Sequence, residues 1–201
     1  MILRFKNTTV SISFFFALCI CLISIFDKSR IVFLNLLSAF LHESGHFLCM
    51  TILGETPKKI SLTPFGMRID RAEINSMSFK KEVLIALSGP AVNFLLSGTF
   101  LLVQLFFEID FSKFVVINFA IGTLNLLVCE PLDGYRATKY LLLQKISEEK
   151  TESILKYSSL VFIFPVAFTG FYVLIKSGYN FSLLLISVYL TSFLFIKQKS
   201  I

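Results

Sequence analysis

Long apolar runs separated by short charged clusters are the feature that most constrains this chain. Several of the runs approach or exceed the roughly 20 helical residues that cross a hydrocarbon core of about 30 Å. Hydrophobic residues make up 55% of the 201 residues, 24 of them Phe, and only 16% are charged. The mean hydropathy of +0.79 lies well outside the soluble globular range. We therefore expect a multi-pass integral membrane protein.

Six candidate spans can be counted, and an even number puts both termini on one side of the membrane. That side carries 15 of the 19 Lys and Arg residues, so the positive-inside rule makes it cytoplasmic. We expect an all-α fold in a bacterial inner (cytoplasmic) membrane, as one domain over residues 1–201 with no separate soluble domain. The predicted spans are 10–26, 31–53, 83–107, 114–143 (interrupted), 157–175 and 181–196.

The basic charge balance has a membrane explanation. A net charge of +6 and a pI of about 9.2 would also suit a nucleic-acid-binding protein. The Lys and Arg residues, however, sit in juxtamembrane loops and do not gather on a soluble basic face. The lipid bilayer is therefore the expected partner, and nucleic acid is not.

The segment 54–81 is the sizeable polar insertion between the second and third spans. Residues 59–63 and 67–70 alternate apolar and polar side chains on either side of Pro64-Phe65-Gly66. This pattern predicts a short membrane-associated β-hairpin at the cytoplasmic face. An irregular loop fits the same segment equally well.

The sequence His42-Glu43-Ser44-Gly45-His46 lies inside the second predicted span. Histidines at i and i+4 project from one helix face about one turn apart, the spacing that grips a single zinc ion. In such sites the intervening Glu does not bind metal but acts as the general base. With two histidines in the chain, a shuffled sequence would give this pattern roughly once in a thousand trials.

The bland alternative is a set of buried polar residues satisfied by neighbouring helices. Ionisable groups in hydrocarbon are costly and tend to mark sites, which argues against it. A span starting near Ile31 and rising 1.5 Å per residue puts His42 and His46 about 16 to 22 Å into the membrane. The site would lie in the cytoplasmic half, so hydrolysis would need an aqueous pocket open to that side.

A catalytic zinc takes three protein ligands and keeps one open position. With no third histidine, we expect a carboxylate from another span, and Asp133 in the fourth segment is the candidate. Pro131 and Gly134 break the helix around it, and broken helices inside membranes usually line sites. The alternative is that residues 130–136 simply leave the membrane.

Taken together, these motifs resemble the site-2 protease family of intramembrane zinc metalloproteases. That family pairs His-Glu-x-x-His in one span with Asn-x-x-Pro-x-Pro-x-Leu-Asp-Gly in a later one, matched here by residues 42–46 and 125–134. Its Gly-Pro-x-x-Asn element corresponds to residues 89–93, and its Pro-Phe-Gly loop to residues 64–66. The order and rough spacing agree over most of the chain.

The resemblance implies a role for each matched residue. His42, His46 and Asp133 would bind one Zn²⁺ per chain, and Glu43 would be the catalytic general base. The compact six-span layout resembles the family's sporulation-protease subgroup, whose substrate is a membrane-associated precursor of a transcription factor. It implies regulated intramembrane proteolysis, of such a precursor or of a signal-peptide remnant, under the control of a regulatory membrane protein.

Asn93 and Asn125 become candidates for substrate or oxyanion contacts through the same resemblance. The chain departs from the family pattern where Val128 and Glu130 replace prolines and Tyr135 replaces a frequent second glycine. Glu130 precedes Asp133 by three residues, so on a helical turn it would point the same way and would be an alternative carboxylate.

The expected activity is hydrolysis of a peptide bond in or near the transmembrane segment of a membrane protein or membrane-associated peptide. Three other interpretations stay open: a metal-ion transporter that uses the same residues as a transient site, a different metalloprotease fold with Glu130 as ligand, and a non-catalytic pseudoprotease.

Overall fold

The computed structural model divides the chain into two compact units, Met1–Thr123 and Leu124–Ile201, which are described separately below. We call them the N-terminal and the C-terminal unit. The residues that the structure describes are 2–5, 8–12, 30–55, 59–63, 66–70, 78–178, 184–185 and 187–192.

The N-terminal unit is built on two packed helices, α2 (Ile31–Ile52) and α3 (Phe79–Phe107). Gly45 lets them approach closely, because a Cβ there would lie 2.8 Å from the carbonyl oxygen of Ser88. A third helix, α4 (Ser112–Asn125), follows α3 after a short connection. The backbone contact at Gly45 brings the histidine-bearing face of α2 directly onto α3.

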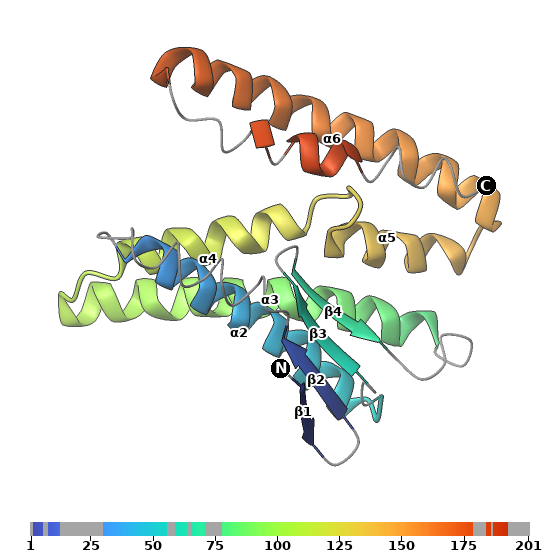
Figure 1. Cartoon of the computed structure of the whole chain (residues 1–201), viewed down its shortest axis with the longest axis horizontal. Coiled ribbons are helices and arrows are strands. Elements are labelled where there is room, and N and C mark those ends of the chain that lie inside the picture. The colour runs from blue at the N-terminus through green and yellow to red at the C-terminus, as the bar shows by residue number, and fades with distance from the viewer. Residues whose placement is uncertain are drawn as a thin grey trace. The chain divides into compact units, whose positions relative to one another are not determined.

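A four-stranded sheet completes this unit, with the strands side by side in the order β1-β2-β3-β4 (Figure 1). The middle strands β2 and β3 pair in parallel, and the two outer pairs are antiparallel. The strands are β1 (Ile2–Phe5), β2 (Thr8–Ile12), β3 (Lys59–Thr63) and β4 (Gly66–Asp70). Strands β3 and β4 occupy the two stretches for which the sequence predicts a hairpin.

The sheet corrects the expected start of the chain. A first span beginning at residue 10 is wrong at that end, because Thr8–Ile12 is a strand, and the β structure is larger than a lone hairpin. Thr8–Ile12 is rich in β-branched residues and alternates Val10 and Ile12 with Thr9 and Ser11, which favours a strand. The rest of the predicted span, 13–26, lies outside the described residues.

The C-terminal unit contains α5 (Asp133–Leu143) and α6 (Glu148–Ser177). The segment 126–132 before α5 is non-helical and folds against α6, where the hydroxyls of Ser158 and Ser159 donate to the Val128 carbonyl at 3.5 and 3.4 Å. Buried Cys129 packs with Ile163 and Leu190 in a small apolar core. These contacts fix the turn that leads into Asp133.

Three helices in the described part of the chain, α2, α3 and α6, are long and apolar enough to cross a membrane. Both α3 and α6 begin earlier than the predicted spans, with polar first turns that contain Glu82 or Glu148 and Glu149. Acidic groups at a helix N-terminus are stabilising, so such helices extend beyond their apolar stretch. The predicted interruption of 114–143 separates α4 from α5, and half of the residues of the predicted span 181–196 lie outside the described ones.

Polar and apolar side chains are distributed as expected for a protein in lipid. Ser38, Asn93 and Asn118 are fully buried, whereas Phe106 and Phe164 expose more than two thirds of their surface. A soluble protein rarely presents so many large apolar side chains to solvent. The chain is thus a mostly helical membrane protein that buries polar side chains in its interior.

Candidate metal centre

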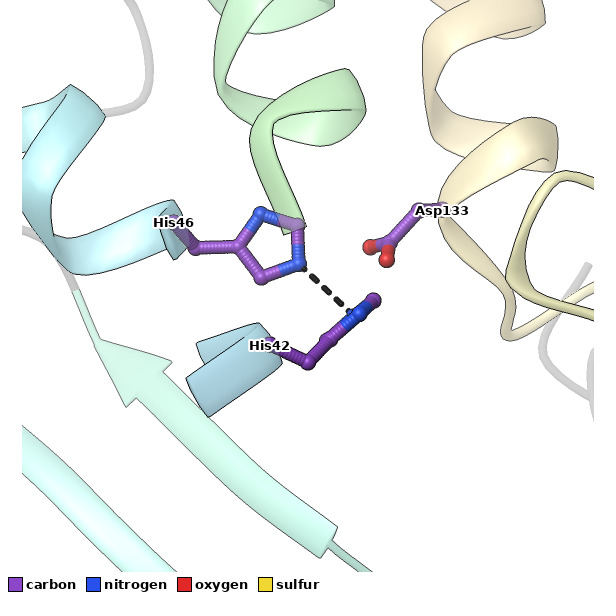
Figure 2. A group of neighbouring side chains, drawn as sticks. All are labelled: His42, His46 and Asp133. Atoms are coloured by element: carbon purple, nitrogen blue, oxygen red, sulfur yellow. Dashed lines mark hydrogen bonds between the residues drawn. The ribbon is translucent and has the colours of Figure 1, made fainter. Parts of the chain in front are cut away.

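His42 and His46 face each other on the buried side of α2. Their Nε2 atoms are 3.2 Å apart, and their rings meet edge to face with centroids 4.8 Å apart (Figure 2). Both side chains are only 5% exposed. The i, i+4 spacing thus brings two imidazoles to one point inside the protein, as the sequence predicts.

The other nitrogen of each ring is held by an oxygen on α3. His42 Nδ1 lies 2.5 Å from Asn93 Oδ1, and His46 Nδ1 lies 2.7 Å from the Ile85 carbonyl oxygen. A carbonyl oxygen only accepts, so both Nδ1 atoms carry the proton and donate. In the neutral rings, both Nε2 atoms then present lone pairs, the form in which histidine binds metal.

The distance between the two Nε2 atoms fits zinc. Two nitrogens, each about 2.0–2.1 Å from a tetrahedral zinc ion, stand about 3.3 Å apart. The observed separation is 3.2 Å. Two lone pairs this close repel each other unless a cation lies between them. The two Nε2 atoms are therefore arranged to bind a metal ion.

Gly89 makes room for this arrangement on α3. A Cβ at this position would collide with Nε2 and Cε1 of His46 and would lie 2.8 Å from Cε1 of His42. The Gly-Pro element therefore has a direct steric role at the site, because any side chain larger than hydrogen would push the imidazoles apart. Pro90 follows within the helix and is also buried.

Asn93 belongs to a buried polar network that joins three helices. Its Nδ2 donates to Asn118 Oδ1 on α4 at 2.8 Å and to the Ser38 carbonyl on α2 at 3.3 Å. Neither Asn118 nor Ser38 is predicted from the motifs of the sequence. A lone amide inside the apolar stretch 114–121 could have indicated Asn118, because buried polar groups need partners.

Both ends of the Asn93 amide are therefore engaged within the protein, and it positions His42. Its predicted contact with substrate or an oxyanion stays a prediction. Glu43 is half-buried on α2, next to His42, and takes part in interactions of its own. Its role as general base also stays a prediction.

In the C-terminal unit, Asp133 is the first residue of α5 and is 8% exposed; Figure 2 draws its carboxylate. Gly134 is the next residue in the same helix, so it does not end the helix as predicted. It is needed because a Cβ there would collide with the Leu126 carbonyl and lie 2.7 Å from the Leu127 carbonyl oxygen. The chain folds back tightly on itself just before Asp133.

The alternative carboxylate rests on a premise that the structure corrects. Glu130 is not one helical turn ahead of Asp133, because α5 begins at Asp133 and Glu130 lies in the preceding turn, before a cis peptide bond to Pro131. Tyr135, at the family's second glycine position, points its hydroxyl to Glu152 on α6 at 3.4 Å. Asn125 is the last residue of α4 and is half-buried.

Comparison with known proteins supports the motif analysis. Residues 31–113, which contain both histidines and the Gly-Pro-x-x-Asn element, match Peptidase family M50. The resemblance to the site-2 protease family is confirmed. A solved site-2 protease from Methanocaldococcus jannaschii has the same fold, with a TM-score of 0.65 and 24% identity over 94% of this chain and 91% of that one.

Two curated relatives are similar over a little more than half of the chain. A zinc metalloprotease of Methanocaldococcus jannaschii is 29% identical over 58% of this chain and 35% of its own length. Stage IV sporulation protein FB of Bacillus subtilis is 27% identical over 63% of this chain and 45% of its own length. The chain thus spans less than half the length of either relative.

Proposed function

We propose that this chain is an intramembrane zinc metalloprotease that hydrolyses a peptide bond in or near a substrate's transmembrane segment. The observation that carries the proposal is the buried histidine pair, whose Nε2 atoms stand 3.2 Å apart with both Nδ1 atoms held by oxygens of α3. The match of residues 31–113 to Peptidase family M50 supplies the reaction class.

The proposed ligands of a single Zn²⁺ are His42, His46 and Asp133. Each of the three side chains is buried and offers one ligand atom, a histidine nitrogen or a carboxylate oxygen. Two imidazoles and one carboxylate are a donor set that catalytic zinc sites use, with a fourth position left for water or substrate. One such ion per chain is expected.

In the proposed mechanism, bound zinc would polarise the scissile carbonyl and make the attacking water more acidic. Glu43 takes a proton from that water on its carboxylate and passes it to the leaving amine. His42 and His46 are kept in their ligating orientation by Asn93 and Ile85 throughout. Asn125 is proposed to contact the substrate.

The substrate is proposed to bind as an added strand. A peptide in the membrane must unwind before cleavage, and pairing with a sheet edge satisfies its backbone groups. Strand β3 already pairs with β2 and β4, and the sheet order puts β4 at one end. We therefore propose that the unwound segment lies beside β4 (Gly66–Asp70).

We also propose the finer membrane arrangement, with six spans in one domain and both termini in the cytoplasm of a bacterium. The substrate is then a membrane protein or membrane-associated peptide, such as a transcription-factor precursor or a signal-peptide remnant. Similarity to stage IV sporulation protein FB motivates a place in sporulation and a regulatory membrane partner.

The test is a comparison of membrane-protein fragments and their new N-termini in cells that express the wild-type chain or Glu43→Gln. Fragments present only with the wild type identify substrate and bond together. Exposed Glu108 offers a matched control, Glu108→Gln, which should behave as the wild type. Identical fragments with Glu43→Gln and wild type would contradict the proteolytic role and would favour a transporter or a pseudoprotease.

A further inference from the structure

Asn118 is a buried amide on α4 that touches neither histidine, yet it completes the hydrogen-bond chain that ends at His42. It is 0% exposed. Its Nδ2 donates to the Phe114 carbonyl and to the Ser38 hydroxyl, both at 2.9 Å, and its Oδ1 accepts from Asn93 Nδ2 at 2.8 Å. Every polar end of the side chain is therefore used.

The direction of these hydrogen bonds is fixed at one end by a backbone group. The Phe114 carbonyl cannot donate, so Asn118 must turn its Nδ2 towards it and its Oδ1 towards Asn93. Asn93 must then present Nδ2 to Asn118 and Oδ1 to His42. His42 Nδ1 has to donate, and the ring has to present its Nε2 lone pair to the metal site.

We propose that Asn118 is a positioning residue that sets the tautomer of His42 by fixing the orientation of the Asn93 amide. Without the Asn118 oxygen, Asn93 retains only the longer bond to the Ser38 carbonyl, at 3.3 Å, to hold its orientation. A flipped amide would donate to His42 Nδ1 and move the imidazole proton to Nε2. A protonated Nε2 cannot bind metal.

His46 provides an internal control. Its Nδ1 donates to a backbone carbonyl, that of Ile85, which cannot flip. The tautomer of His46 is therefore independent of Asn118. A substitution of Asn118 that acts as proposed must change the tautomer of His42 and leave that of His46 unchanged. The chain has two histidines, so a spectrum of protein labelled in histidine contains no others.

The experiment is ¹⁵N NMR of histidine-labelled, metal-free protein at a pH where both rings are neutral, for the wild type and Asn118→Ala. The wild type should show both rings in the Nδ1–H form. Asn118→Ala should give His42 a new Nε2–H population and leave His46 unchanged.

Zinc affinity is the second readout, and it should fall about 10–100-fold in Asn118→Ala, as for other residues that orient a metal ligand. Ser97→Ala is the matched control, because Ser97, like Asn118, is buried and makes a hydrogen bond between α3 and α4. Its hydroxyl donates from α3 to the Val115 carbonyl on α4 at 3.1 Å. It should leave the histidine spectrum and zinc affinity unchanged.

An unchanged His42 tautomer in Asn118→Ala would overturn the proposal, as would equal changes in His42 and His46. If Asn118→Ala fails to fold, the wild-type spectrum still tests the proposal. A dominant Nε2–H form of His42 in the wild-type protein would also overturn it. The inference rests on the proposed metal site. The tautomer is read without metal or substrate, so a chain that cleaves nothing would still show it.

Discussion

Two close contacts at glycine, one in each unit, hold the candidate ligands in different ways. At Gly89 the neighbours are the movable imidazole rings of His42 and His46, whereas at Gly134 they are the backbone carbonyls of Leu126 and Leu127. Side chains can rotate away from an intruding methyl group, but a folded backbone cannot. An added methyl group at Gly89 should therefore disturb the geometry of the histidine pair. The same change at Gly134 should lower the stability of the turn before Asp133.

Gly89→Ala should have the largest effect, which is loss of zinc binding with little loss of folding. The new methyl group would displace the His46 ring, and the two Nε2 atoms would no longer converge. Zinc content after dialysis and the thermal unfolding temperature measure the two consequences separately. Gly98→Ala is the control, because Gly98 lies in the same helix and a Cβ added there would meet nothing within 4 Å.

Gly134→Ala should instead lower the free energy of unfolding, by about 1–3 kcal/mol or more, as overpacking does in other cores. The methyl group would collide with the Leu126 carbonyl, so the turn before α5 would have to move. Thermal unfolding in detergent measures this. A variant as stable as Gly98→Ala would show that the turn adapts and would remove the proposed contrast.

Asn93→Ala tests whether side-chain contacts hold the histidine pair in place. It removes the oxygen that accepts from His42 Nδ1, at 2.5 Å. Zinc affinity should fall about 10–100-fold, since partners that orient metal ligands have effects of this size. Titration with zinc against a competing chelator gives the value, and an affinity equal to that of wild type would contradict the positioning role of Asn93.

Lys139→Met should have the smallest effect. Lys139 and Glu152 form a salt bridge of 2.6 Å between α5 and α6, with side chains 25% and 32% exposed. Partly exposed pairs contribute about 0.2–1 kcal/mol. The unfolding temperature should shift slightly and zinc content should stay the same. A loss of zinc would mean that the orientation of α5 depends on this ion pair as well as on Gly134.

The two regions also differ in how far the sequence predicts them. His42 and His46 follow from i, i+4 spacing on one helix, which is a local rule. Asn118 depends on which face α4 turns towards α3, and no local pattern specifies that. The N-terminal strands escape prediction because Val10 and Ile12 lead into a longer apolar run, and the alternation of residues 8–12 is too short to stand out from it.

The Asp133 region is predictable in composition but not in shape. Pro131 correctly indicates a break before Asp133, whereas Gly134, predicted to break the helix, is a packing residue inside it. Aligning Glu130 with Asp133 requires a helical turn between them, and the structure has α5 starting only at Asp133. Tertiary contacts with backbone atoms decide such details, and sequence periodicity does not contain them.

The most direct test of the central claim is the zinc content of purified, extensively dialysed protein in four forms: wild type, Glu43→Gln, Asp133→Ala and Glu130→Ala. The wild type, Glu43→Gln and Glu130→Ala should each retain one zinc ion per chain, and Asp133→Ala should lose it. Stoichiometric zinc in Asp133→Ala, or its loss in Glu130→Ala alone, would contradict the proposed ligand set.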